Sequence, residues 1–182
     1  MKASEIIRQA NLAAMEIVRY GNPSLVAQCA LIEEFDESLA ALSERMFELM
    51  FHAKGVGLAG PQVGVNVRLF VACPSSEPGD RQVYVNPNIV SAAGWQEEEE
   101  GCLSVPGVAG KIKRRAVVTV RAMDLRAQPF EQTGEGLLAR IFQHEIDHLD
   151  GVLLVDRMGS LARLAHRKTL KELLERHSVV GK

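Results

Sequence analysis

The feature that most constrains this chain is a short run, His144-Glu145-Ile146-Asp147-His148, inside a segment with the apolar spacing of a helix. Two histidines four positions apart on a helix share one face, one turn apart. Two imidazoles placed in this way can bind one divalent metal, and a glutamate beside the first can reach the open side of that metal. The run therefore predicts a metal-dependent hydrolase.

Composition and charge are those of a globular domain. The chain has 182 residues, of which 47% are hydrophobic and 24% charged, and its formal net charge is −2. This near-neutral balance argues against a protein that coats DNA. No run approaches the length of a membrane span, and the three widely spaced cysteines do not form a disulfide framework. We expect one catalytic domain over residues 1–182, located in the cytoplasm and without a membrane partner.

The hydrophobic spacing predicts an α+β domain in which mostly antiparallel strands surround the helix that carries the histidines. Helical segments are expected over residues 4–18, 38–52, 136–150 and 157–177, the last as a single amphipathic C-terminal helix. Strands are expected over residues 65–72, 82–90, 117–123 and 129–132. Residues 55–64 are too rich in glycine for a regular helix, and residues 94–100, with their run of glutamates, are expected to form a loop.

Two histidines are half of a tetrahedral metal site, and a catalytic site needs a third protein ligand. The carboxylates downstream of the histidine run lie close to the end of its helix or on a helix whose apolar face packs elsewhere. Cys102 is the better candidate, because its neighbour Gly101 permits close approach of the backbone. A thiolate with two imidazoles suits zinc or iron(II). The alternative, a lone thiol that only fills the core, stays open at this point.

Three separated segments resemble one family, the peptide deformylases. Residues 55–62 read GVGLAGPQ, similar to the family pattern GxGLAxPQ; residues 100–104 match EGCLS; and residues 143–148 match QHExDH. The histidine motif alone is shared by many hydrolases, but the three motifs in this order and spacing are specific. The resemblance implies a fold of the peptide-deformylase type and extends from about Leu39 through the last helix. Gly60 departs from it, standing where many relatives have alanine.

The resemblance implies hydrolysis of the N-formyl group from the initiator methionine of newly synthesised proteins, with release of formate. It also implies one divalent metal ion per chain, iron(II) in the cell, with zinc or nickel able to substitute. The implied ligands are three side chains: Cys102, His144 and His148. Glu145 would carry a proton from water to the leaving amine. The side-chain amide of Gln62 and the backbone N–H of Leu103 would donate to the formyl oxygen.

The substrate contacts are inferred from small and apolar residues near these motifs. Gly57 and Gly101 would let the peptide backbone lie close and pair in strand fashion. Val56, Leu137 and Ile141 are candidates for the methionine pocket, although simple core packing explains the last two equally well. A ligating imidazole usually donates its other N–H to a carboxylate or a carbonyl, and Asp147 or Glu100 could accept it. Arg114 would then pair with Glu100.

Two other functions are compatible with the histidine run alone. A zinc endopeptidase could be built on the same helix, and a binding module could use a structural metal with four protein ligands. The C-terminal segment adds one more feature, an excess of cations: Arg157, Arg163, Arg167, Lys168, Lys171 and Arg176. A solvated helix face is the simplest explanation for them. The resemblance adds a second, docking on the ribosome near the nascent chain.

Overall fold

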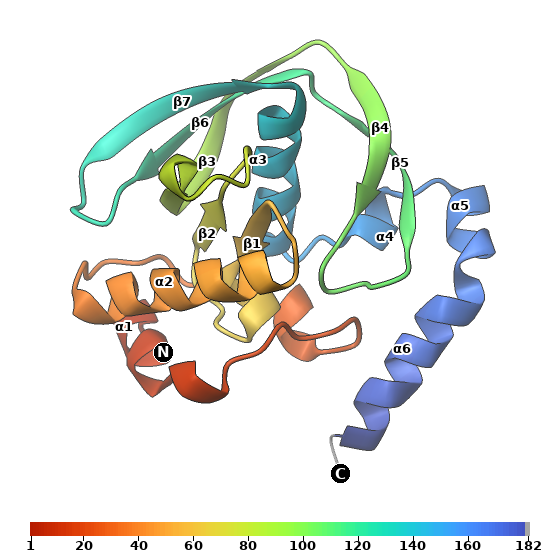
Figure 1. Cartoon of the computed structure of the whole chain (residues 1–182), viewed down its shortest axis with the longest axis horizontal. Helices are drawn as coiled ribbons and strands as arrows, with labels where there is room; N and C mark the ends of the chain where they lie inside the picture. The colour runs from red at the N-terminus through yellow and green to blue at the C-terminus, as the bar shows by residue number, and fades with distance from the viewer. Residues whose placement is uncertain (181–182) are drawn as a thin grey trace.

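The computed structural model describes residues 1–180, and its framework is a five-stranded antiparallel sheet in the order β1-β2-β3-β6-β7. These strands span Gly57–Ala59 (β1), Leu69–Ala72 (β2), Gln82–Ala93 (β3), Val117–Met123 (β6) and Pro129–Glu135 (β7). A separate two-stranded hairpin is formed by Gln96–Gly101 (β4) and Ala109–Arg114 (β5). The hairpin arches beside the larger sheet and reaches the C-terminal helices (Figure 1).

Two helices cover opposite faces of the larger sheet, α2 (Glu37–His52) and α3 (Gly136–Leu149). The alternation along β2 shows this, because successive side chains of a strand point to opposite faces. Leu69 and Val71 belong to the apolar cluster that contains α2, whereas Phe70 and Ala72 belong to the cluster that contains α3. β2 is therefore buried on both sides, and the expected arrangement of antiparallel strands around a central histidine helix is confirmed (Figure 1).

A glycine with a positive φ marks each end of α3. Gly136 begins the helix with a φ of 52°, which is unfavourable for residues with a Cβ. Gly151, just after the cap residue Asp150, has a φ of 73°, the left-handed conformation that commonly ends helices. The predicted bounds of this helix are correct to within one residue, so the two histidines lie one turn apart as expected.

The expectation of a loop over residues 94–100 is wrong from residue 96 onward, because residues 96–100 belong to β4, and β5 was not predicted. Strand propensity is low in a run of glutamates. Cross-strand charge pairs stabilise β4 instead, since Glu97 lies opposite Lys113 and Glu99 lies opposite Lys111. The short strand β1 was not predicted either. The four predicted strands differ from the observed ones only at their ends: β2 begins at Leu69, and β3 and β7 continue three residues beyond their predicted ends.

Two predicted helices are also wrong. The helix expected over residues 4–18 ends early, since α1 spans Ala3–Gln9 and is followed by a short 3-10 turn at Leu12–Ala14. The single helix expected over residues 157–177 is three helices: α4 (Leu154–Arg157), α5 (Ser160–Ala165) and α6 (Arg167–Val180). Gly159 is extended between the first two. No helix within residues 1–180 is both long and apolar enough to cross a membrane.

The C-terminal helices carry a stripe of leucines, and part of this stripe packs on the hairpin. Leu170 and Leu173 are buried in a third apolar cluster, which also contains Cys102, Val105 and Ile112. The other leucines of the stripe are exposed: Leu161, Leu164 and Leu174. The last helix therefore supports the segment that carries Cys102.

Candidate active site

A cleft of about 410 Å³ opens between α3, the hairpin and the glycine-rich segment that leads into β1. The residues that the sequence singled out for the site line it with three exceptions: His148, which is only 1% exposed, Arg114 and Asp147. Leu137, whose side chain could have been core packing, is 51% exposed and faces this cleft. Ile141 is buried in the α3 cluster and also lines the cleft.

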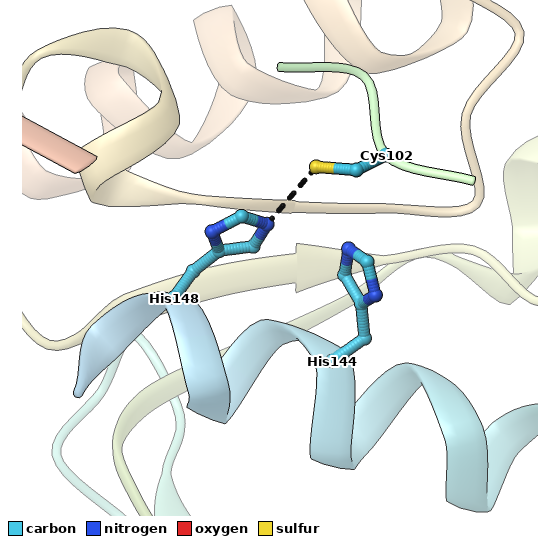
Figure 2. A group of neighbouring side chains, drawn as sticks. All are labelled: Cys102, His144 and His148. Atoms are coloured by element: carbon cyan, nitrogen blue, oxygen red, sulfur yellow. Dashed lines mark hydrogen bonds between the residues drawn. The ribbon is translucent and has the colours of Figure 1, made fainter. Parts of the chain in front are cut away.

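Three candidate metal ligands meet in this region (Figure 2). The ligand atoms of Cys102, His144 and His148 all lie within 4.8 Å of one another, and Cys102 Sγ is 3.3 Å from His148 Nε2. The two imidazoles project from successive turns of α3 toward the thiol. His148 Nδ1 is buried without a hydrogen-bond partner among the described residues. One thiol and two imidazoles whose ligand atoms lie this close together are a donor set that fits a divalent zinc or iron ion.

Cys102 and His144 each stabilise the charged form of the other. Burial alone would raise the pKa of the Cys102 thiol, but His148 and His144 lower it well below its ordinary value. Burial likewise disfavours the charged form of His144, yet hydrogen bonds to Cys102 and Glu100 raise its pKa to about 10. The site is therefore prepared to hold a thiolate, the form of cysteine that binds metals.

Glu100 is the carboxylate that orients the first histidine. Its Oε2 lies 3.2 Å from His144 Nδ1, which leaves Nε2 of that ring for a metal. Arg114 binds both oxygens of Glu100 at 3.0 Å, as the sequence suggested. Burial opposes the charge on Glu100, but His144 and Arg114 lower its pKa to about 2. Asp147, the other candidate, accepts instead from Arg114 and Arg157.

Glu145 has the opposite environment. It is 4% exposed, and its Oε2 has no hydrogen-bond partner among the described residues. Burial therefore raises its pKa to about 6, a value suited to a group that both takes and gives a proton near neutral pH. The space for this carboxylate comes from Gly57, since a Cβ there would stand 2.4 Å from Glu145 Oε1. At Gly101 a Cβ would meet nothing closer than 3.9 Å, so the protein itself leaves that position open.

Gln62 and Leu103 are held at the same end of the cleft. Gln62 Oε1 accepts from the Ala59 N–H at 2.8 Å, which turns its Nε2 toward Cys102 Sγ at 3.6 Å and Ser104 Oγ at 3.3 Å. The Arg19 guanidinium donates to the carbonyl oxygen of Leu103. The N-terminal segment thus braces the loop that follows Cys102.

Sequence reasoning missed Ser104, Arg19 and Arg140 as parts of this site. Ser104 lies inside the EGCLS motif, so the motif itself was a usable signal. Arg140 lines the cleft one turn before His144, and helical spacing could have found it. Arg19 is 84 positions from Leu103, and no local pattern predicts such a contact.

A cleft that combines a low-pKa thiol, two imidazoles and a buried carboxylate of raised pKa defines a metal-dependent hydrolase. The chain belongs to the polypeptide deformylase family, whose model matches residues 14–164. A peptide deformylase from Acidobacterium capsulatum is 49% identical over 149 residues, covering 81% of this chain and 88% of the relative.

Solved structures agree with this assignment. A peptide deformylase from Legionella pneumophila is 45% identical with a TM-score of 0.84, covering 90% of this chain and 96% of that one. A peptide deformylase from Plasmodium falciparum is 32% identical with a TM-score of 0.89, covering 92% and 99%. The fold is therefore that of the family. The group of Cys102, His144 and His148 is the kind of metal site that is typical of this family.

The glycine at position 57 gives a direct test of this geometry. Gly57→Ala places a methyl group where the Glu145 carboxylate lies, so the carboxylate must move. We expect turnover to fall roughly 100-fold with the bound metal retained, because small displacements of a reacting group cost about this much. Hydrolysis rates and metal content of the purified variant measure both.

Gly159→Ala is the matched control, since a Cβ there would meet nothing within 4 Å. It should keep wild-type turnover. Wild-type turnover in Gly57→Ala as well would show that Glu145 tolerates displacement, contrary to the geometry described.

Proposed function

We propose that this chain hydrolyses the N-formyl group from the formylmethionine of newly synthesised polypeptides and releases formate. The observation that carries the proposal is the meeting of Cys102, His144 and His148 with Glu145 at one cleft, in a chain of the polypeptide deformylase family. Cys102, His144 and His148 would hold one divalent metal. When bound, such a metal lowers the pKa of a water molecule and polarises a carbonyl.

Glu145 is the proton carrier in this proposal. Its raised pKa and its unpartnered oxygen let it take a proton from the attacking water and then pass that proton to the leaving amine. The oxygen of the formyl group gains negative charge when water adds to its carbon. Gln62 Nε2 and the Leu103 N–H donate to that oxygen, and each such donor is worth roughly 100- to 1000-fold in rate.

The cleft also supplies contacts to the rest of the substrate. Gly101, which has open space at its missing Cβ, lets the peptide backbone approach β4 and pair with it. Val56, Leu137 and Ile141 line the apolar side of the cleft and would receive the methionine side chain. A formyl carbon carries only hydrogen, so crowding at this point would reject an acetyl group.

The two alternative functions have less support. The metal-ligating group contains three residues, and no fourth His, Cys, Asp or Glu joins it among the side chains that the structure describes. A structural metal site needs four protein ligands. A zinc endopeptidase would share the histidine run, but the chain belongs to a different family.

Removing the charge of Glu145 tests the mechanism. Glu145→Gln keeps the size of the side chain but cannot accept a proton, so we expect formate release to fall roughly 100- to 10,000-fold. Metal content should stay at the wild-type level, because Glu145 is not a ligand. Glu98→Gln, an exposed position on β4, is the control and should retain full turnover. Turnover of Glu145→Gln within tenfold of wild type would remove Glu145 from this role.

We also propose that iron(II) is the metal in the cell, with zinc or nickel able to replace it. Three-ligand iron(II) centres keep several positions open, whereas zinc favours four-coordinate geometry. We expect the iron protein, prepared without oxygen, to turn over at least about tenfold faster than the zinc protein. Exposure to air should inactivate the iron form, since thiolate and iron(II) are both oxidisable. Equal turnover of the two forms, at equal metal content, would contradict the assignment.

A cytoplasmic location and ribosome docking complete the proposal. The exposed cations of α5 and α6, including Arg163, Arg167 and Lys168, form a surface to which ribosomal RNA phosphates would be attracted. Truncating the chain after Gly159 is a poor test of this docking, since it would also remove the buried Leu170 and Leu173.

Charge reversal is the better test of docking. Arg163→Glu with Lys168→Glu should weaken ribosome binding roughly tenfold or more and leave hydrolysis of short formyl peptides unchanged. The matched control reverses two exposed cations elsewhere, Lys2 and Arg126. Ribosome affinity that is equal in both double variants would count against docking through these helices.

A further inference from the structure

A buried arginine that the proposed mechanism does not use lies in the wall of the cleft. Arg140 is on α3, and Leu137, Arg140, Ile141 and His144 follow one another at spacings of three, one and three residues. This spacing puts all four on one helix face, and all four line the cleft. Arg140 therefore shares this face with two residues of the proposed methionine pocket and with the first metal ligand.

One side of the Arg140 guanidinium is bound to the hairpin. Nη2 lies 3.1 Å from Glu100 Oε1 and donates to the carbonyl oxygen of Glu99 at 3.3 Å. Glu100 is already held by Arg114 and His144, so this bond is not needed to pair its charge. It fixes the arginine, and with it the direction of the rest of the guanidinium.

The other side of the guanidinium is unpaired. The side chain is only 8% exposed, and Nη1 is buried without a hydrogen-bond partner among the described residues. A buried donor without an acceptor is unfavourable, and proteins rarely leave one in place. An aliphatic residue at this position would serve a purely apolar pocket better. The spare donor therefore points to an acceptor brought by the molecule that enters the cleft.

The proposed substrate carries a suitable group. The methionine side chain is apolar except for its thioether sulfur, which is polarisable and a weak hydrogen-bond acceptor. We propose that Arg140 is a specificity-determining residue, whose Nη1 gives the methionine pocket a polar end that recognises the sulfur of the first side chain. The inference rests on the proposed deformylase function and extends it to the choice between methionine and side chains of the same shape.

Norleucine tests this directly, because it replaces the sulfur with a methylene group and keeps the length of the chain. We would measure kcat/KM for two peptides that differ only in the first residue, formyl-Met-Ala-Ser and formyl-Nle-Ala-Ser. The wild-type chain should prefer methionine about 3- to 10-fold, the range expected from one modest hydrogen bond. In Arg140→Met, which has a similar reach but no donor, the preference should fall to less than about twofold.

A third peptide strengthens the contrast. Methionine sulfoxide presents a strong acceptor oxygen in place of the sulfur. Relative to formyl-Met-Ala-Ser, its kcat/KM should drop roughly tenfold or more from wild type to Arg140→Met, because a bond to a charged donor is lost. Arg121→Met removes an exposed arginine on β6, outside the cleft, and should leave all three ratios at their wild-type values.

Each ratio compares substrates on one preparation, so partial loss of fold or metal in a variant cancels. A methionine-to-norleucine ratio near one in the wild-type chain would overturn the proposal without any variant, and so would an unchanged ratio in Arg140→Met. If the wild-type chain released no formate from any of the peptides, the deformylase function itself would fail. The two failures are therefore distinguishable.

Discussion

The site depends on one buried carboxylate, Glu100. It belongs to β4, binds Arg114 of β5, and binds Arg140 and His144 of α3. The β4–β5 hairpin is a separate two-stranded sheet, so backbone bonding to the larger sheet does not hold it in place. A buried charge is tolerated only with partners, and here those partners come from both walls of the cleft. The ion cluster therefore ties the strand that leads to Cys102 to the helix that carries the histidines.

The same cluster explains why two nearby carboxylates differ in character. Glu100 has several cationic partners, which lower its pKa to about 2 and keep it a fixed anion behind His144. Glu145 is buried, one of its oxygens has no hydrogen-bond partner in the part of the chain that the structure describes, and its pKa rises to about 6. Pairs of acids whose environments push their pKa values apart are how one fold separates an orienting charge from a proton carrier. Gly57 leaves the space that the Glu145 carboxylate occupies, because it has no Cβ.

The sequence predicted the parts of the molecule that local patterns encode. The histidine helix was found because its apolar period, its motif and its terminal Gly151 agree. β4 was missed because its stability comes from cross-strand pairs with lysines in β5, which a run of glutamates does not reveal. The C-terminal segment was predicted as one helix because its leucine spacing continues across His166, where α5 ends and α6 begins. The contact of Arg19 with Leu103 arises from tertiary packing, which periodicity alone does not encode.

The central claim is that one metal, held by Cys102, His144 and His148, makes this cleft a deformylase. The most direct measurement is a titration of iron(II), without oxygen, into chelator-treated protein, with formate release followed on formyl-Met-Ala-Ser and on acetyl-Met-Ala-Ser. The account predicts activity on the formyl peptide that rises linearly and saturates at one metal per chain, with no hydrolysis of the acetyl peptide. Activity that survives complete metal removal, or equal hydrolysis of both peptides, would contradict it.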